Sequence, residues 1–493
     1  MKKIIMLCTL TLLFFLPGCE GEIVDDSGGY DGTYSGENDN NDTEIGEEQA
    51  EEGNETNFFF FTYDDSASTA AVELVKYRLN NGILPETNLA RPWEFFNYEE
   101  FDASGAEDYG IFHLAMGLSI RDRITDGKSN GQKEYLFGAY CGSDTITKDE
   151  RDNVVLTLIV DVSGSMDSET ISVEETRTTL LELVKEGLLY MEDSLKAGDI
   201  INIVTFSSSA FTVASALTWP EDRLLYEEEI ESLTTLDSTN LNDGIARGYE
   251  MAQETFDPEK MNRIVILTDA YANTGEVDPK VISEHTVING KEGIFFSGIG
   301  IGDGFNEQFL NELTDTGKGA YFTMITRNDA RRIFEDRFIA LSMVAARDVR
   351  FKLEYPASLT HQSGAAEEVS HDETDIQPTN FSYNTSQYFF ETFIAEGNEP
   401  SDTEEFTLTV MYSDPETGTD KEVSLNMSIE QLSSLQAGNI RDAEAVFLLN
   451  MYLGGQSTYD EVTAVLDTHH AQSDSPLFNE YAGYIEKLHA LRE

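Results

Sequence analysis

Positive charge is scarce in this sequence of 493 residues. It contains 32 Lys and Arg residues against 92 Asp and Glu residues, which gives a formal net charge of −60. Such a chain repels phosphate groups, and this argues strongly against nucleic acid as a partner. The excess of carboxylates is typical of a protein that stays soluble in a salty or extracytoplasmic setting, and it also suggests a general affinity for divalent cations.

Cysteine is also rare, with three residues in the whole chain. Cys8 lies in an apolar stretch near the N-terminus and Cys19 follows that stretch, so Cys141 is the one cysteine that remains within the expected folded part. A single thiol cannot form an intramolecular disulfide. Cys141 lies in an apolar strand pattern, which favours a buried structural thiol over a reactive nucleophile.

The N-terminal segment has the pattern of a processing signal rather than of folded structure. Two lysines precede the apolar stretch Ile4–Leu16, which at about 13 residues is short for a membrane span. The next residues, Leu16-Pro-Gly-Cys19, resemble the bacterial lipoprotein signal. The resemblance implies that residues 1–19 are a signal peptide and that lipid on Cys19 anchors the chain without spanning the membrane. The alternative is an ordinary secretory signal with a chance cysteine.

Residues 20–57 form a second segment without the composition of a fold. They contain no Lys or Arg and are rich in Asp, Glu, Gly and Asn. Such a segment cannot bury a core, so we expect an acidic, disordered linker.

Apolar strands alternate with amphipathic helices between residues 153 and 346. This alternation predicts an α/β fold with a mostly parallel sheet that is covered on both faces. Sheets of this kind bind ligands beyond the carboxyl ends of their strands. We expect strands at 154–160, 199–206, 263–268, 293–301 and 319–324, and helices at 173–195, 241–255, 279–287, 305–313 and 329–346.

The regions on either side of this domain have a different pattern. Residues 58–152 contain an expected strand at 58–62, a helix that runs to Asn80 with Ser66 or Ser68 as its cap, and strands at 111–120 and 133–142. Residues 347–430 alternate as a β module, with strands at 349–355, 387–395, 405–412 and 421–427. We expect one β-sandwich into which the α/β domain is inserted, or which flanks it. Residues 431–493 follow as a helical C-terminal region.

The sequence Asp161-Val-Ser-Gly-Ser165 directly follows the first expected α/β strand. A buried strand that ends in Asp-x-Ser-x-Ser presents one carboxylate and two hydroxyls to a single point. These are hard oxygen ligands that suit Mg²⁺. Thr239 lies before the helix at 241–255, and Asp269 follows the strand at 263–268. A second Asp-x-Ser-x-Ser, at residues 64–68, lacks its own downstream Thr and Asp, so we interpret it as a turn and helix cap.

The order Asp-x-Ser-x-Ser, then Thr, then Asp, each on its own loop, resembles the metal-ion-dependent adhesion site of von Willebrand factor A domains. The resemblance implies that Ser163, Ser165 and Thr239 bind the ion directly, and that Asp161 and Asp269 act mainly through water. It also implies an open position for an Asp or Glu of a protein ligand. Mg²⁺ is the expected ion, with Mn²⁺ or Ca²⁺ as alternatives. Ala270 departs from the usual Gly after the aspartate, which concerns the geometry of the loop and not the ligands.

A wider resemblance includes the flanking regions. Leu79-Asn-Asn-Gly-Ile-Leu-Pro85 and Phe95-Phe-Asn-Tyr98 are similar to the segment that precedes this domain in a family of uncharacterised bacterial lipoproteins. Residues 349–491 resemble the C-terminal region of that family more loosely. The family is sometimes labelled calcium-activated chloride channel-like. We expect no channel activity, because no stretch after the signal is long and apolar enough to span a membrane.

These observations predict a lipid-anchored protein of the cell envelope, at the outer membrane or cell surface if the cell is Gram-negative. We expect it to bind a protein partner through a divalent metal ion and not to be an enzyme. One alternative is an assembly scaffold in which the α/β domain is a framework. Another is a metal-dependent hydrolase, which would need a general base beside the metal, and the sequence shows no obvious candidate.

Overall fold

The computed structural model describes residues 56–125, 128–170, 177–236, 238–270, 293–316, 319–395, 397–415, 417–433, 437–470 and 475–493. Residues Asn54–Glu493 form one compact unit. The predicted signal peptide with Cys19, the predicted acidic linker up to residue 55, and the helix expected at 279–287 lie outside the described residues.

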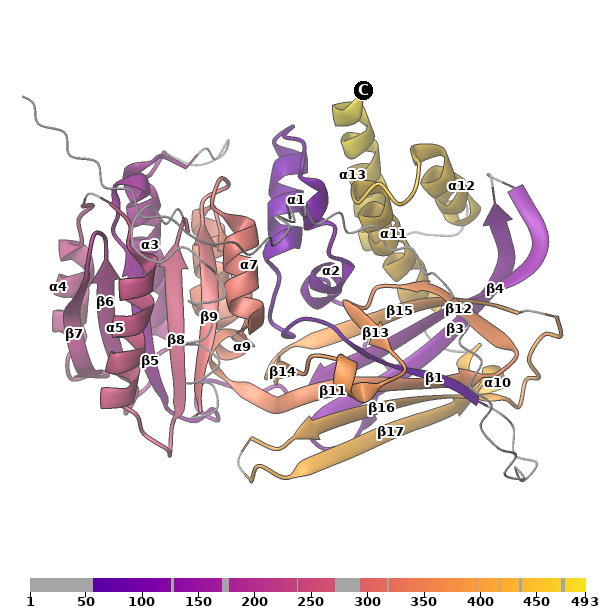
Figure 1. Ribbon diagram of the computed structural model, residues 1–493, viewed down its shortest axis with the longest axis horizontal. Helices are drawn as coiled ribbons and strands as arrows, with labels where there is room; N and C mark the ends of the chain where they lie inside the picture. The colour runs from indigo at the N-terminus through magenta and orange to yellow at the C-terminus, as the bar shows by residue number, and fades with distance from the viewer. Residues whose placement is uncertain are drawn as a thin grey trace, which may run out of the picture. The chain divides into compact units, whose positions relative to one another are not determined.

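The α/β part is built on a six-stranded sheet with the order β10-β9-β8-β5-β6-β7 (Figure 1). Every neighbouring pair is parallel except β6 and β7, which are antiparallel. All residues of β5 are buried, as expected for an apolar strand in the centre of a parallel sheet. The predicted mostly parallel sheet is therefore confirmed. Its strands are β5 (Val154–Asp161), β6 (Ile200–Phe206), β7 (Ala210–Thr218), β8 (Met261–Thr268), β9 (Ile294–Ile301) and β10 (Tyr321–Met324).

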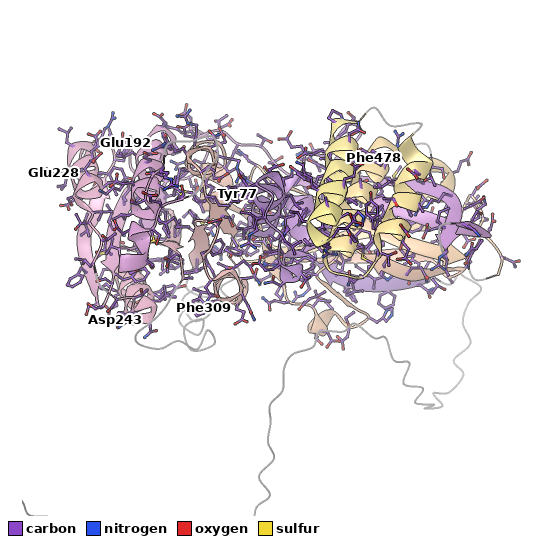
Figure 2. All side chains as sticks on the ribbon, turned by 90° about the horizontal axis from the view of Figure 1, so that it is seen from above. Tyr77, Glu192, Glu228, Asp243, Phe309 and Phe478 are labelled. Atoms are coloured by element: carbon purple, nitrogen blue, oxygen red, sulfur yellow. The ribbon has the colours of Figure 1, made fainter. Side chains whose placement is uncertain are left out.

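Helices cover both faces of this sheet. Ile159 of β5 belongs to the core that contains α5, whereas its neighbour Leu158 belongs to the core that contains α3 and α4. Figure 2 shows Glu228 of α4 on one side of the sheet and Asp243 of α5 on the other. The alternating side chains of each strand thus pack against different helices. The helices are α3 (Leu180–Tyr190), α4 (Arg223–Ser232), α5 (Leu241–Glu254) and α7 (Glu307–Thr316).

Two predicted helices were wrong in extent. The helix expected from residue 173 begins at Leu180, because Thr179 is its N-cap residue. The Thr179 side chain accepts a hydrogen bond from the Glu182 amide, and Thr179 also forms an isolated β-bridge with Glu169. The helix expected over 329–346 is divided into α8 (Arg327–Arg331), a π turn and α9 (Phe338–Ser342). Its last predicted residues belong instead to β11 (Val344–Pro356), where pairing with neighbouring strands overrides helical periodicity. Strand β7 and helix α4 were not predicted.

The β part consists of two antiparallel sheets that share a core. Their orders are β13-β1-β11-β16-β17, with β14 beside β11, and β12-β15-β4-β3-β2. Phe137 stacks on Phe406 across the sheets, with ring centroids 5.1 Å apart. The strands are β1 (Thr56–Thr62), β2 (Glu107–Asp108), β3 (Phe112–Thr125), β4 (Lys128–Ser143), β11, β12 (Leu359–Gly364), β13 (Glu368–Ser370), β14 (Thr379–Ser382), β15 (Ser386–Ala395), β16 (Glu405–Ser413) and β17 (Asp420–Ser428).

Strands that precede the α/β part pair with strands that follow it. β1 pairs with β11, and β4 pairs with β15 over nine residue pairs from Ser386↔Gly142 to Ile394↔Glu134. The chain therefore leaves the sandwich after β4, forms the α/β part, and returns to the sandwich at β11. This connectivity confirms the predicted fold class, an α/β domain combined with a β-sandwich.

The C-terminal region is helical, as predicted, with α11 (Ala437–Leu453), α12 (Tyr459–His470) and α13 (Pro476–Arg492). Val446, Leu449 and Ile485 are fully buried, so their apolar faces serve internal packing. The Lys76 ammonium of α1 (Ala70–Asn80) connects this region to the rest, because it lies 5.4 Å from the ring centre of Tyr481. Of the helices in the described ranges, none is both long and apolar enough to cross a membrane.

The predicted caps of helix α1 were wrong. The helix begins at Ala70 with Thr69 as its N-cap residue. Ser66 Oγ instead accepts a hydrogen bond from the Ser382 amide (2.8 Å), and Ser68 Oγ accepts one from the Tyr321 amide (3.0 Å). Both serines are fully buried. The second Asp-x-Ser-x-Ser is thus used to fix β14 and β10 to the N-terminal segment.

Candidate metal-binding site

The carboxyl edge of the parallel sheet gathers the predicted ligands. Asp161 is the last residue of β5 and is paired with Phe206, the last residue of β6. The loop after β5 is held to this edge, because the Val162 amide donates to the Phe206 carbonyl (3.0 Å). Asp269 directly follows Thr268, the last residue of β8, and β8 lies on the other side of β5. The loops after three strands therefore begin at one place.

Hydrogen bonds fix the Asp161 carboxylate and the two serines as one group. Oδ1 of Asp161 accepts the Ser163 amide (2.8 Å), and Oδ2 accepts the hydroxyl of Thr268 (2.6 Å). Ser163 Oγ lies 3.0 Å from Ser165 Oγ. The 3-10 turn Gly164–Asp167 carries the second serine back toward the first. Two hydroxyl oxygens and a carboxylate thus converge, as the sequence pattern predicted.

The two aspartates of the site are buried close to one another. Asp161 is 0 % exposed and Asp269 is 3 % exposed. Burial is the largest cause that raises the pKa of Asp161 to about 6, and the negative charge of Asp269 raises it further against the hydrogen bonds from Thr268 and Ser163. Two carboxylates in one low-dielectric site repel one another, and a cation held there would remove this repulsion.

Thr239 lies on an adjoining loop and is 1 % exposed. The next residue, Asn240, caps helix α5 by accepting the Asp243 amide (3.3 Å), and its own amide donates to the Ser207 carbonyl (2.5 Å). Ser207 directly follows β6. The loop that carries Thr239 is therefore fixed at the same edge of the sheet. Backbone contacts of Asn240 place this loop there.

One residue of this arrangement, Thr268, was not anticipated from the sequence. Thr268 donates to Asp161 and accepts the Ala270 amide (2.8 Å), so it couples the first loop to the third. The sequence feature that could have identified Thr268 is its position at the end of an expected strand, directly before Asp269. Ala270 adopts a φ of 55°, in the left-handed region that a glycine occupies freely. The chain thus keeps the glycine-type turn with an alanine, which costs roughly 1–2 kcal/mol.

Helix α5, which begins after Thr239, lies unusually close to the sheet. Gly244 and Gly248 are four residues apart and therefore share one face of the helix. A Cβ on Gly244 would lie 2.7 Å from the ring of Phe206, and a Cβ on Gly248 would overlap Cδ1 and Cγ1 of Ile159. These glycines set the distance between α5 and the strands that end in the site.

We expect Gly248→Ala to lower the free energy of unfolding by roughly 1–3 kcal/mol, because the methyl group overpacks a closed core. Helix propensity alone would give the opposite sign, a gain of about 1 kcal/mol. Gly483→Ala in α13 is the matched control, since a Cβ there meets nothing within 4 Å. Urea unfolding of both variants measures the difference, and equal stabilisation by the two alanines would contradict the close-packing argument.

The donor set fits a hard divalent cation. It offers three hydroxyls and two carboxylates, and oxygen ligands of this kind suit Mg²⁺. Within the described residues, His, Cys, Asp and Glu side chains form no cluster of three or more that could hold a metal. A site built mainly from hydroxyls is consistent with that result. The ligand roles of the five residues remain a prediction.

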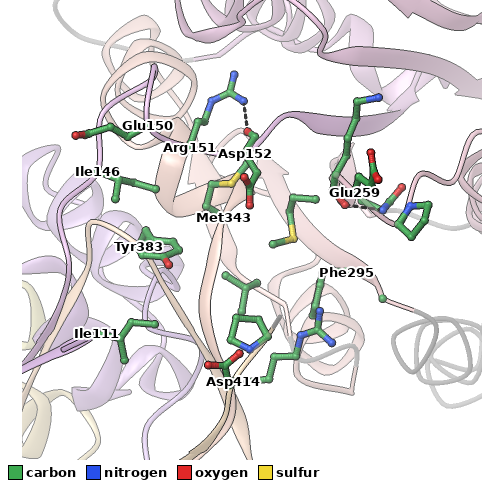
Figure 3. A pocket seen from close by; sticks show the side chains of 18 of the residues that line it. Ile111, Ile146, Glu150, Arg151, Asp152, Glu259, Phe295, Met343, Tyr383 and Asp414 are labelled. Carbon is green, nitrogen blue, oxygen red and sulfur yellow. Dashed lines mark hydrogen bonds between the residues drawn. The ribbon is translucent and has the colours of Figure 1, made fainter. Parts of the chain in front are cut away.

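A cavity of about 770 Å³ lies elsewhere (Figure 3). Its lining includes Asp152 before β5, Asn262 of β8 and Phe295 of β9, together with Arg347 and Tyr383 of the β part. Asp152, Asn262 and Phe295 lie at the amino ends of the parallel strands. The eight residues of β5 separate them from Asp161 by about 26 Å. The cavity is therefore distinct from the candidate metal site.

Part of the chain matches a known domain family. Residues 156–272 match the family model for the von Willebrand factor type A domain. "Uncharacterized protein YfbK" of Escherichia coli is 25 % identical over 306 residues, which cover 61 % of this chain and 51 % of that protein. Inter-alpha-trypsin inhibitor heavy chain H3 of Rattus norvegicus is 32 % identical over 197 residues, 38 % of this chain and 20 % of that protein. The chain thus spans about half of the first relative and a fifth of the second.

Among solved structures, the von Willebrand factor type A protein from Catenulispora acidiphila is similar to this chain. The TM-score is 0.44 at 16 % sequence identity, and the alignment covers 80 % of this chain and 92 % of that one.

Proposed function

Because the chain carries a von Willebrand factor type A domain, we propose that it binds another protein and that a divalent cation bridges the two. The observation that supports this most is the convergence of Asp161, Ser163 and Ser165 beside a second buried carboxylate, Asp269. The proposal concerns binding and includes no reaction.

In this proposal, Ser163, Ser165 and Thr239 hold the cation directly, and Asp161 and Asp269 hold it through water. Mg²⁺ is the proposed ion, with Mn²⁺ or Ca²⁺ as alternatives. A bound cation supplies a positive charge to which an Asp or Glu carboxylate of the partner can bind. Neutral hydroxyl ligands leave that charge available, whereas a cage of carboxylates would neutralise it. Asp161 positions Ser163 by accepting a hydrogen bond from the Ser163 backbone amide. The hydroxyl of Thr268 donates a hydrogen bond that orients Asp161.

Retention of envelope and extracellular proteins on the immobilised protein tests this proposal. The comparison is between Mg²⁺ and EDTA. We expect at least one protein to be retained in Mg²⁺ and released by EDTA. Partners that are retained equally in both conditions would contradict a metal bridge and would favour a scaffold role of the β and helical parts.

We also propose that lipid on Cys19 anchors the protein in the cell envelope. The pattern Leu16-Pro-Gly-Cys19 supports this. We expect the protein to sediment with membranes, and Cys19→Ser to release it into the soluble fraction, because one or two acyl chains supply the attachment. Cys141→Ser is the matched control, since Cys141 is fully buried in β4. Membrane retention of Cys19→Ser would contradict the anchor.

A further inference from the structure

Leu236 lies beside the loop that carries the first three candidate ligands. Its backbone amide donates to the carbonyl of Val162 (2.6 Å), and Val162 stands between Asp161 and Ser163. A Cβ on Gly164 would lie 3.5 Å from the Leu236 carbonyl oxygen. Leu236 is therefore fixed by its backbone directly against the Asp-x-Ser-x-Ser loop.

The side chain of Leu236 is 47 % exposed. Exposed leucines are common on protein surfaces and by themselves indicate nothing. Leu236 differs in its position. Leu233, three residues earlier, is buried in the core, whereas Leu236 is exposed and its backbone is fixed against the loop that carries the proposed ligands. A partner whose carboxylate reaches the cation approaches the loop against which the backbone of Leu236 is fixed.

The charges around the loop limit what else such a partner can offer. Asp167 follows Ser165 on the same turn, and Asp243 lies in the first turn of α5, close after Thr239; both are exposed. The whole chain has a net charge of −60. Further carboxylates on the partner would be repelled by this surface. Two sources of affinity remain beside the one carboxylate that the metal binds: cationic side chains, which this acidic surface attracts, and apolar contact, which Leu236 offers.

We infer that Leu236 contributes to partner selection: the protein prefers a segment in which a large apolar residue neighbours the metal-binding Asp or Glu. This inference rests on the proposed function. The apolar side chain would cover Leu236 when the carboxylate is bound, and burial of the two surfaces against each other favours association.

Four immobilised nonapeptides provide the test in Mg²⁺ and in EDTA. Three have a central glutamate, with leucine before it, leucine after it, or serine on both sides. The fourth has leucines around a central glutamine. We expect the wild type in Mg²⁺ to bind the better glutamate–leucine peptide about three- to tenfold more tightly than the serine peptide. Leu236→Ser should bind both equally. Leu224→Ser is the matched control, because Leu224 is 79 % exposed at the far end of α4.

The outcomes distinguish the role of Leu236 from the metal-bridged binding on which it rests. Magnesium-dependent binding of glutamate peptides without a leucine preference, or with a preference that Leu236→Ser retains, would overturn the inference and leave the metal bridge standing. Binding that is independent of Mg²⁺, equal binding of the glutamine peptide, or no binding of any glutamate peptide would contradict the proposed function itself. A thermal unfolding midpoint equal to that of the wild type would show that Leu236→Ser is folded.

Discussion

Asp161→Ala is expected to weaken divalent-cation binding by roughly 10- to 100-fold and to abolish magnesium-dependent retention of the partner. The magnitude is typical of groups that orient metal ligands through hydrogen bonds. Asp161 accepts hydrogen bonds from the Ser163 amide and the Thr268 hydroxyl. Its removal therefore leaves both Ser163 and the end of β8 without these restraints. Isothermal titration with Mg²⁺ and Mn²⁺ measures the first effect, and retention on the immobilised variant measures the second.

Asp167→Ala is the matched control for this experiment. Asp167 lies on the turn that carries Ser165, but it is exposed and is not one of the five predicted ligands. We expect its metal affinity to remain within about twofold of the wild type, since a single exposed carboxylate that does not ligate the ion contributes little in water. If Asp161→Ala bound metal and partner as the wild type does, the predicted site would be wrong. Equal losses in both variants would indicate a general charge effect.

Asp199→Asn is expected to lower the free energy of unfolding by about 3–5 kcal/mol, because it leaves the buried charge of Arg151 without a counterion. Both side chains are 0 % exposed. The Asp199 carboxylate accepts from both terminal nitrogens of Arg151 at 3.1 and 2.5 Å, from Asn153, and from the amides of Val154 and Lys196. These bonds fix the starts of β5 and β6 to each other. Urea unfolding measures the loss.

The dependence on pH gives a second measure of the same pair. Burial opposes the charged form of Asp199, but the hydrogen bonds and charge of Arg151 outweigh it and hold its pKa below the ordinary value. A lowered pKa contributes stability that is present above about pH 4, the unfolded value, and is lost as the pH falls through the folded value. We therefore expect the acid-induced loss of stability below pH 4 to be shallower in Asp199→Asn than in the wild type.

Arg177→Gln is the control for this second prediction. Its ion pair with Glu169 has a length of 2.9 Å, but the two side chains are 74 % and 55 % exposed. Exposed pairs contribute little, because water and salt screen them. We expect no measurable change in unfolding. A loss from Asp199→Asn as small as that from Arg177→Gln would contradict the argument from burial.

The sequence by itself determined the alternation of strands and helices in the α/β domain. Strands such as Val154–Asp161 are continuous apolar runs, and period and length distinguish them from the amphipathic helices between them. It also located the five candidate ligands at strand and helix ends, because each belongs to a short pattern that can be recognised without contacts. The helix expected over 329–346 failed because its last residues pair with β14, and such pairing is not local.

Only the tertiary structure decided which side chains meet. The pairing of β4 with β15 joins residues more than two hundred positions apart, and no periodicity in either segment specifies its partner. The contact of Thr268 with Asp161 depends on β8 lying beside β5, and the position of Leu236 depends on its backbone bond to Val162. Local sequence sets the conformations that a segment prefers, whereas packing of the whole chain selects among their combinations. The sequence therefore indicated which residues are candidate ligands, whereas the arrangement of β6, β5 and β8 in the sheet brings their loops together.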